Sequence, residues 1–126
     1  MFVRINRHAL LLLHGESLVL HGGAPGIRDE GLLDSALARP VNQAACGAPD
    51  VFDGAAAYAC GLAWNHPFID GNKRAAFLAC GLFLHLNGVH LSASQSDATL
   101  IMLALAAGDL PEPDFAAWLR RHGAPR

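Results

Sequence analysis

Hydrophobic residues recur at intervals of three and four positions along most of this chain, which is the spacing of α-helices with a buried face. Polar or glycine-rich stretches interrupt the pattern and separate the helices. The pattern predicts about six helices, over residues 6–21, 29–38, from Asp50 or Asp53 to Trp64 or Asn65, 72–86, 96–107 and 113–122. Residues 89–95 are predicted to be briefly extended. We therefore predict an all-α fold, a compact helical bundle.

Local signals indicate where some of these helices begin and end. Asp29 and Ser96 precede helical patterns and are predicted to be N-caps, whose side-chain oxygens accept hydrogen bonds from the first turn. Arg39 lies directly before Pro40, and a residue before proline disfavours helical backbone angles. The second helix is therefore predicted to stop at residue 38, with a loop over 41–50.

Two of the predicted helices are apolar on almost every face, the one that ends at Trp64 or Asn65 and the one over 72–86. A helix of this kind is usually surrounded by the rest of the fold. We expect these two helices to form the centre of the protein. The loop over 65–71 joins them and carries the densest polar chemistry in the chain.

Composition limits the partners that the chain can bind. Its 126 residues fit a single domain over 1–126, and 52% of them are hydrophobic. The net charge of −2, without a run of Lys and Arg, provides no basic surface, so no direct nucleic-acid partner is expected. The sequence shows neither an apolar stretch of membrane-spanning length nor a signal peptide. We expect a soluble, cytoplasmic protein with no membrane partner.

Neither the cysteines nor the histidines form a metal-binding pattern. Cys46, Cys60 and Cys80 lack metal-type spacing and are expected to be free thiols, with Cys60 and Cys80 buried as small apolar residues. None of the seven histidines has a histidine partner four residues away. A structural metal site is therefore disfavoured.

The central loop continues into the next helix as Asn65-His66-Pro67-Phe68-Ile69-Asp70-Gly71-Asn72-Lys73-Arg74. A helix N-terminus binds anions through its free N–H groups and dipole, and Lys73 and Arg74 add two positive charges to this one. Asp70 is an oxygen ligand suited to Mg²⁺, which accompanies substrate phosphates. His66 can accept a proton from a hydroxyl nucleophile. The segment thus offers a base, a metal ligand and a phosphate site.

Each of these residues also has a purely structural interpretation. His66 before proline could simply end a helix, and Asp70 before glycine could be a turn residue. Lys73 and Arg74 could be solvated residues of a first turn. Positive charge at a helix N-terminus is unfavourable, however, unless an anion binds there. The combination therefore favours function.

The segment His66–Arg74 resembles the signature of the Fic/Doc family, His-x-Phe-x-Asp/Glu-Gly-Asn-Gly/Lys-Arg, and most closely the Doc (death-on-curing) toxin branch. Residues 22–37 and 107–110 also look like the corresponding parts of that family, so the resemblance covers nearly the whole chain. It implies a Fic/Doc helical bundle that binds ATP and Mg²⁺. It also implies the following roles: His66 as general base on a Ser, Thr or Tyr hydroxyl, Phe68 as the anchor of the loop, Asp70 as the Mg²⁺ ligand, Gly71, Asn72 and Lys73 as the anion-binding turn, and Arg74 as the phosphate ligand.

Two positions bear on the reaction. AMP-transferring Fic proteins have Gly at the position of Lys73 and a second Arg at the position of Phe77. Without that Arg, the resemblance implies that ATP binds reversed and presents its γ-phosphate, as in a Doc kinase that acts on an elongation factor. The alternatives are AMP or other nucleotidyl transfer to a target protein, and a binding protein that retains the fold without activity.

Inhibition of the expected activity is predicted to come from a separate protein. Many Fic proteins carry an inhibitory helix with the pattern Ser/Thr-x-x-x-Glu-Gly/Asn. Here Glu30-Gly31 is present, but Gly26 occupies the hydroxyl position. The resemblance therefore implies a Phd-type antitoxin that places a helix in a groove beside the active site.

Overall fold

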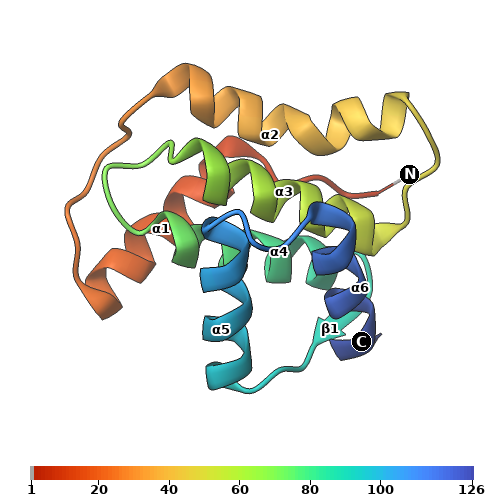
Figure 1. Cartoon of the computed structure of the whole chain (residues 1–126). Coiled ribbons are helices and arrows are strands. Elements are labelled where there is room, and N and C mark those ends of the chain that lie inside the picture. Colours follow the sequence, from red (N-terminus) through yellow and green to blue (C-terminus); the bar gives the residue numbers. More distant parts are fainter. Residues whose placement is uncertain (1) are drawn as a thin grey trace.

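The computed structural model describes residues 2–126 and confirms the all-α prediction. These described residues form six helices and two short strands (Figure 1). These elements are α1 (Arg7–His21), α2 (Glu30–Ala45), α3 (Val51–Asn65), α4 (Asn72–Leu86), β1 (Val89–Leu91), α5 (Gln95–Ala106), α6 (Glu112–His122) and β2 (Gly123–Pro125). The loop predicted to carry the chemistry joins α3 to α4.

Helix α3 is the central element, as its apolar sequence predicted. Every residue from Gly54 to Ala63 is buried. Helix α2 lies along one side of α3 and α4 along another, and α5 and α6 complete the packing (Figure 1). Small side chains permit a close approach, since a Cβ atom on Gly61 would lie 3.0 Å from the Cα atom of Ala36 in α2. The C-terminal half of α3, which leads into the loop, therefore packs directly against the backbone of α2.

The start of α3 is set by Asp50. Its side chain accepts a hydrogen bond from the N–H of Asp53, and the Asp53 carboxylate accepts one from the N–H of Asp50, which is a capping box. Arg120 on α6 binds both carboxylates, at 2.9 and 2.8 Å. Asp50 is thus the N-cap, and the ion pairs tie α6 to the first turn of α3.

Helix α2 does not stop before Pro40, so that prediction was wrong. The helix runs through Pro40 to Ala45, although proline breaks one backbone hydrogen bond and normally bends a helix. Its last turns are held from outside. Arg39 forms an ion pair with Glu112 at 2.6 Å and lies over the Trp64 ring, while Pro40 itself is buried. These contacts with α3 and α6 outweigh the local preference.

The C-terminal third differs from the prediction in small ways. The N-cap of α5 is Ser94 rather than Ser96, because the Ser94 hydroxyl oxygen accepts the hydrogen bond from the N–H of Asp97. The extended stretch after α4 is confirmed over Val89–Leu91. It pairs antiparallel with Gly123–Pro125, a strand that the sequence pattern did not predict. Backbone pairing of these segments joins the end of the chain to the end of α4.

The cysteines are free in the structure. Cys60 and Cys80 are buried, as predicted, and burial raises the pKa of both thiols well above the usual range. Over residues 2–126, the helices are all too short or too polar to cross a bilayer.

The close contact between α2 and α3 can be tested with two glycines in helix interiors. Gly61→Ala should lower the free energy of unfolding by about 1–3 kcal/mol, because the new methyl group meets the α2 backbone. Gly81→Ala in α4 is the matched control. Nothing lies within 4 Å of its Cβ position, so it should raise that free energy by about 0.5–1 kcal/mol. If urea unfolding showed equal increases in the free energy of unfolding for both variants, that result would contradict the close contact between α2 and α3.

Candidate active site

The loop between α3 and α4 is bounded by two residues with left-handed backbone conformation. His66 has φ 49° and ψ 57°, and it is the one non-glycine residue with positive φ in residues 2–126. Gly71 has φ 76° and lies directly before the first residue of α4. Left-handed angles are easy for glycine but strained for histidine. The loop therefore turns sharply at both ends.

Phe68 anchors the loop in the core, as predicted, and is 1% exposed. The Asn72 side chain holds it in place, with Oδ1 accepting from the Phe68 N–H at 2.9 Å and Nδ2 donating to the Phe68 oxygen at 3.0 Å. The buried ring of His14 stacks on the Phe68 ring with a centroid distance of 3.7 Å. Asn72 was predicted to bind the anion. Because its Oδ1 and one Nδ2–H group are engaged with Phe68, its backbone N–H and its second Nδ2–H group remain for that role.

Asp70 is exposed, and its carboxylate is oriented by backbone groups. Oδ1 accepts from the N–H of Gly71 at 2.8 Å, and Oδ2 accepts from the N–H of Ala24 at 3.3 Å. His14 Nε2 lies 2.7 Å from the backbone oxygen of Asp70. A Cβ atom on Gly23 would lie 2.9 Å from Oδ2, so only glycine fits beside the carboxylate without a shift. The candidate metal ligand thus has a defined position.

The segment between α1 and α2 lies against the loop between α3 and α4. The N–H of Arg28 donates to the oxygen of Pro67 at 2.7 Å, and the N–H of Ile69 donates to the oxygen of Gly26 at 3.1 Å. Ile27 and Phe68 form an antiparallel bridge. Residues 22–28 therefore form one wall of the site. The glycines of this segment were the sequence feature that could have indicated this wall. No sequence feature indicated that His14 supports the loop.

The N-terminus of α4 carries the predicted cations and no side-chain cap. Lys73 is exposed and Arg74 is half-buried. Arg74 Nη1 is buried and has no hydrogen-bond partner within residues 2–126. The same is true of the hydroxyl of Ser17, a residue that is 4% exposed. Unpaired polar atoms of this kind are rare in folded proteins, which favours a polar ligand here.

A cavity of about 580 Å³ opens beside these residues, between α1, α4 and α5. Its polar lining consists of the cations Lys73 and Arg74 and of four further side chains, Ser17, His21, Gln95 and Thr99. Phe77, Met102 and Leu103 provide part of its apolar lining, so the cavity combines positive charge with apolar surface. This combination suits a ligand that carries both phosphate and an aromatic base.

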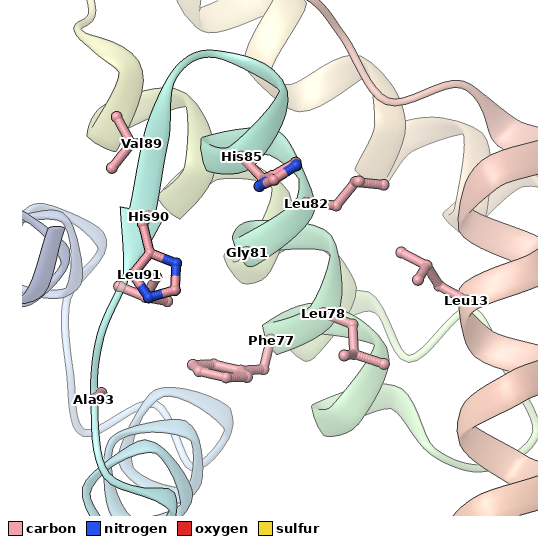
Figure 2. A pocket seen from close by; sticks show the side chains of 10 residues that line it. All are labelled: Leu13, Phe77, Leu78, Gly81, Leu82, His85, Val89, His90, Leu91 and Ala93. Carbon is pink, nitrogen blue, oxygen red and sulfur yellow. The ribbon is translucent and has the colours of Figure 1, made fainter. Parts of the chain in front are cut away.

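A second cavity of about 400 Å³ lies next to the first and shares Phe77, Leu78 and Ala93 with it. It is lined mainly by α4 and β1, with Leu13 of α1 on the opposite side (Figure 2). His85 and His90 are the titratable residues of its wall. The remaining lining is apolar, so this surface continues the apolar lining of the first cavity.

The contribution of the two hydrogen bonds between Asn72 and Phe68 to stability can be tested directly. Asn72→Ala removes both hydrogen bonds and leaves the Phe68 backbone groups unpaired, so the free energy of unfolding should fall by about 1–3 kcal/mol. Asn42→Ala is the control, since Asn42 is exposed on α2. This substitution should change the free energy of unfolding by less than about 0.5 kcal/mol. Similar midpoints of urea unfolding for the two variants would show that these two hydrogen bonds do not stabilise the loop.

Parts of this sequence are similar to those of known proteins. Residues 4–84 match the model of the Fic/DOC family. Toxin Doc of Mycolicibacterium smegmatis is 48% identical over 77 residues, which are 60% of this chain and 59% of that protein, less than two thirds of its length. Protein kinase doc of Escherichia phage P1 is 34% identical over 118 residues, 93% of each chain. The resemblance read from the motif is confirmed, and the chain belongs to the Fic/DOC family.

Proposed function

We propose that this chain is an enzyme that transfers the γ-phosphate of ATP to a Ser or Thr hydroxyl of a target protein and thereby inhibits growth. The target implied by the Doc resemblance is a translation elongation factor. The observation that carries the proposal is the structure of the loop between α3 and α4. An exposed imidazole and an exposed carboxylate lie on one short loop that ends at an uncapped, doubly cationic helix N-terminus.

In the proposed reaction, His66 accepts the proton of the target hydroxyl. The hydroxyl oxygen attacks the γ-phosphorus, the bond from that phosphorus to the β-phosphate oxygen breaks, and ADP leaves. Lys73, Arg74 and the free N–H groups of α4 hold the phosphate oxygens and stabilise their charge. Positioning and charge stabilisation are the main contributions that proteins make to phosphoryl transfer.

Asp70 is suited to hold Mg²⁺. Each of its carboxylate oxygens accepts one backbone hydrogen bond, which leaves lone pairs for a metal ion. Mg²⁺ is commonly bound through one or two carboxylates together with substrate phosphates, so a single carboxylate is sufficient here. When bound, Mg²⁺ would neutralise charge on the phosphates. The backbone bonds from Ala24 and Gly71 keep the carboxylate in place for this role.

Phe77 favours γ-phosphate transfer over AMP transfer. It lies one turn beyond Arg74 on α4, where AMP-transferring Fic proteins carry their second Arg, and its ring lines both cavities. An apolar ring cannot hold a terminal phosphate. It can pack against a nucleoside instead, which agrees with a nucleotide whose γ-phosphate faces His66. The name of the phage P1 relative, Protein kinase doc, supports the same choice.

Labelled ATP distinguishes the two reactions. Incubation with cell extract should transfer label from the γ-position of ATP to one protein and none from the α-position. His66→Ala should reduce the transfer at least about a hundredfold, because the general base is lost. His8→Ala, which changes an exposed histidine on α1, is the control and should leave the rate unchanged. Transfer of α-label instead would establish nucleotidyl transfer.

We also propose that a Phd-type antitoxin inhibits this protein by placing an amphipathic helix in the apolar surface formed by the two cavities. Leu78 is 37% exposed and Leu103 is 49% exposed, and both line this surface. The internal inhibitor pattern lacks its hydroxyl residue, and its Glu30 is engaged in an ion pair with Arg7. An apolar groove beside a cationic site suits an amphipathic helix with acidic residues.

Substitutions in this surface should weaken antitoxin binding. Leu78→Lys or Leu103→Lys should raise the dissociation constant by roughly tenfold to a hundredfold, because each buried leucine contributes about 1.5–3 kcal/mol. Leu12→Lys is the control, since Leu12 is 54% exposed on α1 and lines neither cavity. The measurement is titration calorimetry with the coexpressed antitoxin. Unchanged affinity in both variants would place the antitoxin elsewhere.

A further inference from the structure

Arg28 makes a contact with the end of α3 that the reaction described above does not use. Its Nε donates to the backbone oxygen of His66 at 2.7 Å, and its Nη2 donates to the backbone oxygen of Asn65 at 2.9 Å. One edge of the guanidinium group thus binds two successive carbonyl groups. A cation at this position is also favoured by the negative end of the α3 dipole. Arg28 therefore caps the helix at the residue proposed as base.

His66 requires such support, because its conformation is locally unfavourable. It is left-handed with a φ of 49°, although it carries a Cβ atom. It also precedes Pro67, and a residue before proline prefers extended angles. Strained residues of this kind persist only where the surroundings hold them. The Arg28 hydrogen bond to the His66 oxygen is a direct contact with the strained peptide.

We propose that Arg28 is a positioning residue, which holds His66 in its left-handed conformation and so sets the direction of the imidazole. The inference rests on the proposed role of His66 as the base. The side-chain hydrogen bonds of Arg28 go to backbone oxygens, and Arg28 does not line the cavity beside Lys73 and Arg74, so its effect passes through the backbone. The same segment donates the Ala24 N–H to Asp70, at 3.3 Å. Residues 24–28 therefore hold the base and the candidate metal ligand from one side.

The geometry requires an arginine rather than any cation. Two donors on one rigid edge match two neighbouring carbonyl oxygens, whereas the single ammonium group of lysine is a compact charge on a flexible stem. Arg28→Lys should therefore behave like Arg28→Ala. If charge alone were sufficient, the lysine variant would behave like the unmodified protein.

The test combines a backbone measurement with kinetics on the full chain. Three-bond NMR couplings that report φ of His66 should move away from the left-handed value in Arg28→Ala and Arg28→Lys. The kcat of phosphate transfer should fall roughly tenfold to a hundredfold, because the base is misplaced. The KM for ATP should stay within about twofold, because the phosphate site is intact. Added guanidinium ion should restore part of the kcat of Arg28→Ala.

Arg121→Ala is the matched control. Arg121 is also an exposed arginine, but it lies in the last turn of α6, and this variant should keep the couplings and the kcat of the unmodified protein. Thermal unfolding followed by circular dichroism defines a temperature at which all variants are folded. The inference is overturned if His66 keeps its left-handed couplings in Arg28→Ala, whatever happens to kcat. The coupling measurement needs no activity, so it decides the inference even if the unmodified protein transfers no phosphate.

Discussion

The pair of hydrogen bonds between the Asn72 side chain and the backbone of Phe68 is the interaction on which the candidate site depends. It closes the loop between α3 and α4 at a fixed shape, with the Phe68 ring buried beneath it. Asp70 and Gly71 lie inside the closed segment, so their positions follow from these bonds. The first turn of α4 has no side-chain cap, because the residue at its N-cap position is Gly71, which has no side chain. The free end of α4 is what makes an anion site possible there.

The loop is supported from outside by two segments that are distant in sequence. His14 on α1 stacks on Phe68 and contacts the backbone of Asp70, while Arg28 binds the carbonyl group of His66. Each contact holds the backbone and leaves the functional side chain exposed. Such an arrangement suits catalysis by positioning, in which the reacting groups must be held and also be reachable. Three chain segments thus build the candidate site, although the candidate functional side chains all lie on one of them.

Much of the fold could be predicted from local pattern, and the errors have physical causes. The ends of α3 were recognisable because Asp50 and Pro67 act through their immediate neighbours. The predicted length of α2 was wrong because Arg39 is held by Glu112, which lies far along the chain. The second strand was missed for a similar reason. It has no hydrophobic pattern of its own and exists by pairing with β1.

The sequence by itself determined that the candidate site residues lie together, because His66, Asp70, Lys73 and Arg74 fall within one short segment whose helix boundary is local. It also determined the family, since the motif spacing is specific. Only the tertiary structure decided how these groups are held. The side chains of His14 and Arg28 act through contacts across at least 37 positions of the chain, which no local pattern encodes. The left-handed conformation of His66 is likewise opposed by its own neighbours and is maintained by the packing around it.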